Sequence, residues 1–476
     1  MSHGRIRVGL AAALLLGVGL AVFAVLRSAW FTDRFLPQPQ PQPQWQASAL
    51  ETWLEPETAR AALLAEYEFR LKHPVVQKLP AADFEGRKLT FADVQPILQA
   101  NCVVCHRPEG NGPFALQTYE QVKRKSAKIK DALRDRRMPP WLADGHYSKV
   151  MDEPTISDVH RSLVVWWIDH GMEEGRAATA SAAPTGPALP PADVVLKAPQ
   201  HTITSNDDTY QCFVLDPGLK ADAYVNAISF QTSNVKTIHH IMMYLDTDGV
   251  LDGKSGSWDC LRNGIVNKLV PIDSWSKGMR LTRYSDDFGY RFPRGSKILL
   301  QTHYGDHKLK GQVEQTTVGL YLRPTPPLHE IKWEILNQFD IAIPPDARKT
   351  ETIKFPVAKD MSVLGLVPHL HHVGRLVDVY MITPDQKKVN LLRINEWVYL
   401  WQTRYMFRQP IKAPKGSTIY MHVVYDNTTS NPNQPNSPLQ AIRYDVCSNQ
   451  EMMVLALFYA DYLPGDEQRI LGALVH

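Results

Sequence analysis

Short alternating runs of apolar and polar residues fill the sequence from about residue 193 to its end. This alternation has the period of a strand with one buried face, and Gly, Pro, Asn and Asp separate the runs as turns require. Such spacing is typical of β-sandwiches with jelly-roll or Greek-key order. The clearest candidate strands are 223–232, 237–245, 297–304, 316–322, 362–367, 376–383, 417–425 and 452–459. We therefore predict two all-β sandwich domains, residues 193–325 and 326–476, joined at a Pro-rich stretch near residue 325.

Two histidines separated by one residue, His369 and His371, lie between two of these predicted strands. On a strand, residues i and i+2 point to the same face, so both imidazoles can converge on one metal ion. Imidazole binds copper, zinc, iron and nickel, so the pair alone does not identify the metal. The alternative is that these histidines are hydrogen-bonded polar residues of an ordinary sandwich.

Three further motifs in this half carry metal-binding side chains. His239 and His240 are adjacent, and strand neighbours face opposite sides. Both can bind one metal only if the strand ends or bulges there, or if the two rings use different nitrogens; otherwise one of them is structural. His303 ends a predicted strand. Met452 follows Glu451, and its soft thioether favours Cu(I), although a lone Met is more often a core residue.

The stretch from Cys102 to His106 reads C-x-x-C-H, the attachment motif of c-type haem. Two thiols at this spacing reach the two vinyl groups of one porphyrin, and the following imidazole falls under the iron. A bare C-x-x-C also fits a redox dithiol or half of a zinc site, but the adjacent His106 favours haem.

The surroundings of this motif predict a small all-α domain over residues 80–176, with helices at 91–101, 126–137 and 156–171. Met138 lies on a Pro-stiffened loop downstream of the motif, the usual place of the sixth iron ligand. Met151, His146 and His160 are the alternatives. The segment resembles class I-type cytochromes c, which implies a covalently bound haem held by Cys102 and Cys105.

The N-terminus contains an uninterrupted apolar run at residues 8–26, between a basic start and Arg27. The run is long enough to cross a bilayer, so we expect residues 1–30 to be an uncleaved transmembrane signal anchor with the rest outside the cytoplasm. Cleavage after export is the alternative. Residues 31–79 are expected to form a Pro/Gln spacer and a short helix that packs on the next domain, and 177–192 a linker. The net charge of +3 gives no reason to expect nucleic acid.

The four β-half motifs, in their order, resemble the copper- and ascorbate-dependent monooxygenases, the peptidylglycine α-hydroxylating and dopamine β-monooxygenase family. The resemblance runs from about residue 195 to 476. It implies two sandwich domains, each with one copper ion. His239, His240 and His303 would hold the electron-transfer copper. The catalytic copper that meets oxygen would be held by His369, His371 and Met452.

The same resemblance implies a disulfide between Cys212 and Cys260, which leaves Cys447 as a free thiol or a small core residue. The chain departs from the family at two positions. Val367 stands where the peptide-amidating member has an Arg that binds the substrate carboxylate, and Ala456 stands where that enzyme has a Tyr. These departures argue against a peptide carboxylate as the handle and favour a neutral or hydrophobic substrate.

Taken together, these features predict a monooxygenase that inserts one atom of O₂ into a C–H bond of a small organic substrate. The haem domain would deliver electrons from a quinol-linked carrier, another cytochrome or an ascorbate-like reductant, on the periplasmic side of a membrane. The alternative from another class is a non-catalytic copper-binding or electron-transfer protein. A third reading places zinc, inert to the haem electrons, in the histidine sites.

Overall fold

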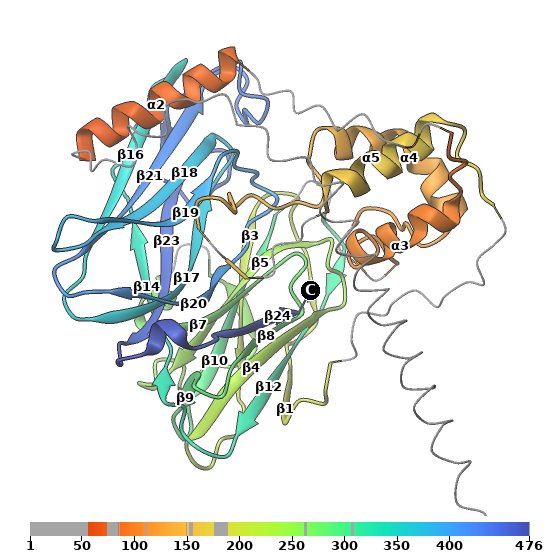
Figure 1. Cartoon of the computed structure of the whole chain (residues 1–476). Coiled ribbons are helices and arrows are strands. Elements are labelled where there is room, and N and C mark those ends of the chain that lie inside the picture. The colour runs from red at the N-terminus through yellow and green to blue at the C-terminus, as the bar shows by residue number, and fades with distance from the viewer. Residues whose placement is uncertain are drawn as a thin grey trace, which may run out of the picture. The chain divides into compact units, whose positions relative to one another are not determined.

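Sandwich-like β-sheets make up most of the part of the chain that the structure describes, and the α-helices of that part lie before the β half (Figure 1). The computed structural model describes residues 56–73, 84, 86–108, 110, 112–148, 150–151, 156–175, 189–260, 264–305 and 309–475. The expected anchor at 1–30, the Pro/Gln repeat and most of the linker at 177–192 lie outside these residues. Within them, no helix is both long and apolar enough to cross a membrane.

The first sandwich pairs a seven-stranded sheet, with main order β1-β12-β4-β8-β24, with a five-stranded sheet of order β6-β3-β10-β5-β7. The strands of the first sheet are β1 (Val194–Lys197), β4 (Ala223–Thr232), β8 (Leu281–Tyr284), β9 (Phe288–Phe292), β12 (Thr316–Arg323), β13 (His329–Glu330) and β24 (Gly472–Val475). Those of the second are β3 (Thr209–Leu215), β5 (Ile238–Asp246), β6 (Ser257–Asp259), β7 (Val270–Ser276) and β10 (Lys297–Tyr304).

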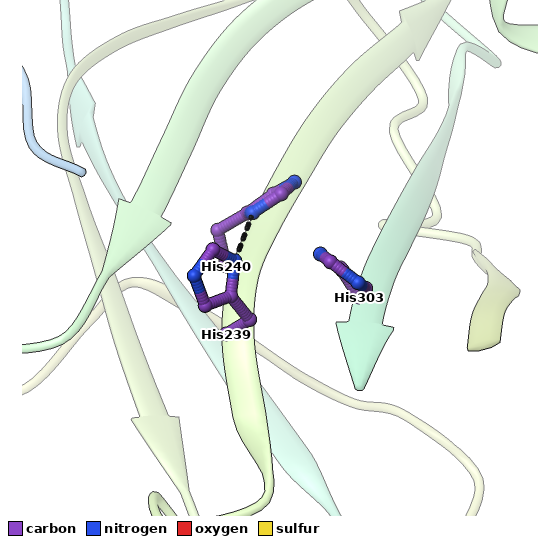
Figure 2. Close-up of side chains that lie close together, drawn as sticks. All are labelled: His239, His240 and His303. Carbon is purple, nitrogen blue, oxygen red and sulfur yellow. Dashed lines mark hydrogen bonds between the residues drawn. The ribbon is translucent and has the colours of Figure 1, made fainter. Parts of the chain in front are cut away.

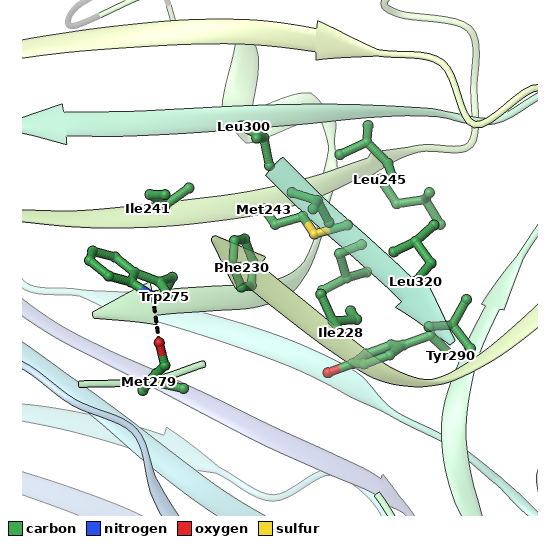
Figure 3. Close-up of a cluster of buried hydrophobic side chains, with 14 of the residues drawn as sticks. Ile228, Phe230, Ile241, Met243, Leu245, Trp275, Met279, Tyr290, Leu300 and Leu320 are labelled. Carbon is green, nitrogen blue, oxygen red and sulfur yellow. Dashed lines mark hydrogen bonds between the residues drawn. The ribbon is translucent and has the colours of Figure 1, made fainter. Parts of the chain in front are cut away.

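The core of this sandwich is built from the alternating residues of both sheets. Ile228 and Phe230 from β4 face Ile241 and Met243 from β5 in one buried cluster (Figure 3). The period-two pattern of the sequence is therefore the pattern of burial, and the predicted strands at 223–232, 237–245, 297–304 and 316–322 are confirmed.

The second sandwich pairs two four-stranded sheets, β14-β23-β17-β20 and β16-β21-β18-β19. The first consists of β14 (Lys332–Asn337), β17 (Met361–Leu370), β20 (Tyr405–Ala413) and β23 (Met453–Asp461), and the second of β16 (Ala347–Pro356), β18 (Gly374–Ile382), β19 (Lys388–Ile394) and β21 (Thr418–Asn427). The predicted strands at 362–367, 376–383, 417–425 and 452–459 are confirmed. Short strands complete the β half: β2 (His201–Thr202), β11 (Val313–Glu314), β15 (Ala342–Ile343) and β22 (Ile442–Arg443). The final strand β24 pairs with β8 of the first sandwich, so the boundary expected near residue 325 does not fully separate the two.

The sheet β14-β23-β17-β20 is buried on both faces, which determines where the second pair of histidines lies. On β23, Leu455 and Leu457 face the core of the second sandwich. The alternate residues Ala456 and Phe458 pack instead with the core cluster of the first sandwich. Because side chains alternate along a strand, every second residue of this sheet is presented to the interface between the sandwiches.

Three helices before the β half surround a small apolar core of their own: α3 (Phe91–Asn101), α4 (Tyr119–Arg134) and α5 (Asp158–Asp169). The predicted helix at 91–101 is confirmed, and α5 lies within two residues of its expected ends. Helix α4 begins seven residues before the predicted start at 126 and ends three residues before the predicted end at 137. The segment between α4 and α5 leaves this core, because Ala143 bridges to Ile394 and Val150 bridges to Phe407 in the second sandwich.

Helix α2 (Pro56–Lys72) packs on β16 and β21 of the second sandwich. The expectation that it would cover the next domain along the chain is therefore wrong. Leu63 joins a small apolar cluster with residues of β18 and β21, and the hydroxyl of Tyr67 donates to Asp426 at 3.0 Å. Glu66 and Arg393 form a buried ion pair at 2.7 Å. Contacts between side chains that are far apart in the sequence thus decide where this helix packs.

Replacing Glu66 with Ala should destabilise the protein by about 1–3 kcal/mol, because the buried guanidinium of Arg393 loses its shorter ion pair and keeps only the one with Asp378 at 3.4 Å. Glu57→Ala is a matched control on the same helix, since Glu57 is 75% exposed in its ion pair with Arg60. Exposed pairs contribute about 1 kcal/mol or less. Urea unfolding of the two variants measures the difference. Equal stabilities would show that the Glu66 pair does not hold the helix.

Candidate metal centre

The adjacent histidines His239 and His240 lie at a β-bulge. Along β5 and β10, His303 pairs with His240, whereas the next residue Tyr304 pairs with Ile238, so His239 is the extra residue. A bulge turns the side chain of its extra residue away from strict alternation. The ligand atoms of His239, His240 and His303 lie within 4.8 Å of one another (Figure 2). The bulge is one of the conditions under which both histidines can bind one metal, so His239 and His240 can belong to the same site.

Hydrogen bonds indicate which ring nitrogens of this first set remain for a metal. The Nε2 of His239 lies 3.1 Å from the carbonyl oxygen of Tyr399, which can only accept, so this nitrogen carries the proton. By the same reasoning, Nε2 of His303 donates to the Asp208 carboxylate at 3.2 Å. The Nδ1 of His303 is buried without a partner among the described residues. The Nδ1 atoms of His239 and His240 face each other at 3.1 Å. Nδ1 is therefore the nitrogen of His239 and of His303 that remains for a metal, and Nδ1 of His240 lies next to that of His239.

The second set, His369 and His371, shares one face of β17 as predicted, while Leu370 between them points into the sandwich core. Nδ1 of His371 donates to the Gln450 carbonyl at 3.1 Å, and its Nε2 is buried without a partner among the described residues. Nδ1 of His369 bonds to Oε1 of Gln402. In this set, Nε2 is therefore the nitrogen left for a metal.

Met452 lies beside the second set. His369 pairs with Val454 and Leu370 pairs with Met453, so Met452 follows on the same face as Val454, next to the level of His371. Met452, His369 and His240 also line one cavity. This placement suits a thioether ligand, and its role in binding metal stays a prediction.

Glu451 organises the backbone around this set. Its fully buried carboxyl accepts hydrogen bonds from the backbone N–H groups of His371 at 2.8 Å and Met452 at 3.1 Å. The other oxygen accepts from Val373 at 2.8 Å and Gly374 at 3.1 Å. One side chain therefore ties together the two segments that carry the second set.

Burial keeps these imidazoles in the form that binds metals. Desolvation, reinforced by neighbouring histidines, lowers the pKa of His239, His240 and His371 well below its usual value. Desolvation also lowers the pKa of His369, to about 4, against the hydrogen bond with Gln402. Neutral imidazole is the ligand form of histidine, so the cluster is prepared for a cation without first losing protons.

The two sets adjoin each other. The ring centroids of His240 and His303 are 4.9 Å apart, and those of His369 and His371 are 5.3 Å apart. Between the sets, the centroids of His240 and His369 are 5.5 Å apart. The sequence predicts two sites in separate domains, whereas the structure brings all five rings into one buried cluster at the interface.

A cavity of about 750 Å³ opens beside the cluster and is lined by both sandwiches. Val367 and Ala456, the two positions where the chain departs from the resembled family, both line it. Arg404 lines it as well, but its guanidinium forms a fully buried pair with the carboxylate of Asp273. The cavity wall is therefore more apolar and aromatic than polar, its one buried guanidinium is already neutralised, and the acidic residues Glu334 and Asp445 also line it.

The C-x-x-C-H stretch follows α3 and has the donor set that a c-type haem requires. Cys102 and Cys105 are half-buried thiols that form no disulfide. Nδ1 of His106 lies 2.9 Å from the carbonyl of Phe114, which leaves Nε2 for iron. A Cβ at Gly112 would lie 2.6 Å from His106 Nδ1, so the glycine lets the loop fit closely around this ring. The residues present therefore fit the group.

Met138 and three alternatives are the residues predicted as the sixth ligand of such a haem. Met138 is 38% exposed and its carbonyl accepts from Arg161, so its role stays a prediction. Met151, one of the alternatives, is buried in the core cluster of the first sandwich. His146 and His160 are exposed.

Cys212 and Cys260 form a disulfide with an S–S distance of 2.15 Å, so the pairing implied by the resemblance is confirmed. Cys447 is half-buried and forms no disulfide. Its segment lies at the interface, because the next residue, Ser448, donates its backbone N–H to Asp208 at 3.1 Å.

The sequence pattern gave no sign of the residues that orient the histidines. Asp208, Tyr399 and Gln402 lie in loops, far along the chain from the rings they contact. Tyr210, which stacks on His303 at 4.2 Å, could be found only from the register of β3 against β10. Knowledge of the strand pairing, which a single sequence does not provide, was the missing signal.

We predict that Asp208→Asn weakens copper binding to the first set by about 10–100-fold, the usual effect of losing a residue that orients a ligand. Burial alone would raise the pKa of Asp208, but hydrogen bonds from His303 and Ser448 lower it, so a carboxylate faces the ring. A Cu(I)-chelator competition titration measures the affinity. The neighbouring exposed residue supplies the control, Asp207→Asn. Unchanged affinity in Asp208→Asn would contradict the prediction.

The sequence matches no protein-family model and no curated protein. Among solved structures, it is similar to the cowpea mosaic virus top component at 10% identity and a TM-score of 0.27, over 62% of this chain and 98% of that one. The major capsid protein P2 of bacteriophage PM2 gives 7% identity and a TM-score of 0.26, over 57% of this chain and 98% of its own. Scores this low carry no argument about fold or function.

Proposed function

We propose that this chain is a copper-dependent monooxygenase that hydroxylates a C–H bond of a small, neutral or hydrophobic organic molecule with O₂. The observation that carries the proposal is the convergence of five histidines from three separate strands, β5, β10 and β17, in one buried cluster beside a cavity. A histidine that only stabilises a sandwich has both ring nitrogens either hydrogen-bonded or exposed to solvent. Here buried nitrogens of His303 and His371 have no partner among the described residues.

The donor set favours copper over the other metals that imidazole binds. His239, His240 and His303 would hold the electron-transfer ion, and His369, His371 and Met452 the catalytic ion. A thioether beside two imidazoles is a soft donor set that keeps Cu(I) accessible. Bound copper supplies one-electron chemistry with O₂, and the protein supplies ligand geometry and a water-poor pocket.

The overall reaction consumes one substrate, one O₂, two electrons and two protons. One oxygen atom enters the C–H bond as a hydroxyl group, and the other leaves as water. The chain's own residues hold the ligand rings neutral, through burial, and fix their orientation through Tyr399, Gln402 and Gln450. A substrate bound in the cavity would contact His240, His369 and Met452, which line it.

Electrons would enter one at a time through a c-type haem held by Cys102, Cys105 and His106, with Met138 as the sixth ligand. This helical region would then be a cytochrome c domain, fed by a quinol-linked carrier, another cytochrome or an ascorbate-like reductant. An extracytoplasmic protein anchored by residues 1–30 suits both the haem motif and the Cys212–Cys260 disulfide, because disulfides persist in oxidising compartments. The sandwiches would have the jelly-roll order common among such double-sheet domains.

The cavity supports the substrate class. Val367, Val454 and Ala456 present small apolar side chains next to the second set. Arg404, the buried cation on the wall, is already paired with Asp273 and offers no free charge to a carboxylate. The wall therefore argues against a substrate carboxylate and supports the neutral or hydrophobic substrate class.

The test is a metal count and a haem spectrum on the purified full chain, followed by O₂ uptake in a screen of small neutral organic compounds. We expect copper, a c-type haem spectrum and O₂ uptake that matches hydroxylated product. Copper without product-coupled O₂ uptake would favour the electron-transfer alternative. Zinc in place of copper, without an electron paramagnetic resonance signal, would overturn the proposal.

A further inference from the structure

Five imidazoles form an unbroken series across the interface between the two sandwiches. Centroid distances within the first set are 5.2 Å for His239 and His240 and 5.0 Å for His239 and His303. The distance between the sets, 5.5 Å from His240 to His369, is nearly the same. On ring spacing alone, His240 belongs to both sets.

Fixed contacts hold the two sets together across this interface. His239 of the first sandwich donates to Tyr399, which belongs to the second. Asp208 accepts from His303 with one oxygen and from the backbone of Ser448 with the other. Ser448 lies three residues before Glu451, whose carboxyl holds the backbone of His371. The carboxylate of Asp208 therefore connects the loop of one set to a ring of the other.

The nitrogens of His240 point to the same conclusion. Its Nδ1 faces His239 at 3.1 Å, within the first set. The hydrogen bond with His239 is the only one of this ring among the described residues, so Nε2 is not engaged there, and the ring lines the cavity together with His369 and Met452. His369 and His371 supply Nε2 donors to the second set, so a ring on the cavity wall with a free Nε2 adds a third nitrogen there.

We propose that the two histidine sets form one dinuclear copper centre, in which His240 lies between two ions held as magnetically coupled neighbours. The inference rests on the proposed function for the identity of the metal. It differs from the two separate mononuclear sites that the resemblance implies. Neutral imidazole has a lone pair on one ring nitrogen only, so binding the second ion would displace the N–H proton of His240 to solvent, and the resulting imidazolate would contact one ion through each nitrogen.

The experiment is electron paramagnetic resonance of the full chain loaded with Cu(II), with the double-integrated signal compared with the copper content of the same sample. We expect the integrated signal to fall well below the copper content and a half-field transition to appear. His240→Ala should lose the coupling, so that its signal equals its copper content. His372→Ala, which removes a histidine outside the series, should keep the coupling. Near-ultraviolet circular dichroism of each variant checks the fold, and His240→Gln serves if His240→Ala fails to fold.

Two outcomes would overturn the inference, and they separate it from the proposed function. Two bound copper ions with a full additive signal would show separate sites, while the monooxygenase proposal stands. Fewer than two copper ions per chain in the wild-type protein would remove both the dinuclear centre and the copper assignment beneath it. Coupling that survives the loss of His240 would show that this ring is not the shared one.

Discussion

We expect hydroxylation to fall by about 10³-fold or more in a His371→Ala variant, beyond the effect of losing a residue that only orients a ligand, while the haem spectrum stays that of the wild-type protein. Loss of a residue that merely orients a ligand costs about 10–100-fold, and His371 is itself an expected ligand. Its Nε2 is buried and has no partner among the described residues, so a metal is the natural occupant of that position. The C-x-x-C-H motif is in a separate helical core, so truncation on β17 leaves it unchanged.

The measurements are turnover, copper per chain and the reduced haem absorbance, each on His371→Ala and on His372→Ala. His372 is the neighbouring histidine, whose ring packs 4.1 Å from Tyr399 instead of joining the series. We expect His371→Ala to retain the copper of His239, His240 and His303 and to lose the second ion. Turnover that survives in His371→Ala would refute the assignment of the catalytic set.

Local patterns predicted the strands and the face of the second histidine pair. His369 and His371 share a face because the strand period is two, and Leu370 between them is fully buried in the sandwich core. The prediction of the helix before the C-x-x-C-H motif also rested on a local pattern. Residues Phe91 to Asn101 have helical periodicity, and the structure forms a helix over the same range. Such features depend on residues that are close in sequence.

Register and interface could not be predicted in this way. The bulge at His239 depends on how β5 pairs with β10, whose residues are more than fifty positions apart. The short distance between the rings of His240 and His369 depends on how one sandwich packs on the other. The pairing of the final strand β24 with β8 of the first sandwich is likewise a contact between distant parts of the chain. These features come from long-range pairing, for which one sequence contains no direct signal.

The packing of the α2 helix is another long-range contact that local sequence patterns could not predict. Its periodicity predicted a helix, but its partner is chosen by the buried pair of Glu66 with Arg393 and by the bond from Tyr67 to Asp426. Nothing near Glu66 in the sequence indicates a guanidinium more than three hundred residues away. Chain order favoured the neighbouring domain, and specific polar contacts outweighed it.

The buried carboxyl of Glu451 provides the second large effect. Glu451→Gln keeps the shape of the side chain but replaces one acceptor oxygen with an NH₂ group. Four backbone N–H groups point at this carboxyl, those of His371, Val373, Gly374 and Met452. The new NH₂ group would face two of them, and each buried donor left without an acceptor costs about 1–3 kcal/mol. We therefore expect a loss of about 2–6 kcal/mol in the free energy of unfolding.

The same change should release the second copper ion selectively, because Glu451 fixes the backbone of both His371 and Met452, whereas the first set depends on Asp208 and Tyr399. Urea unfolding and copper content, measured together, test both parts. Glu467→Gln is the control, since Glu467 is exposed and accepts only from the hydroxyl of Tyr462 in the described structure. If Glu451→Gln unfolds at the same urea concentration as the control and keeps both ions, then the carboxyl does not organise the second set, and the backbone of the H-x-H turn must hold its ligands unaided.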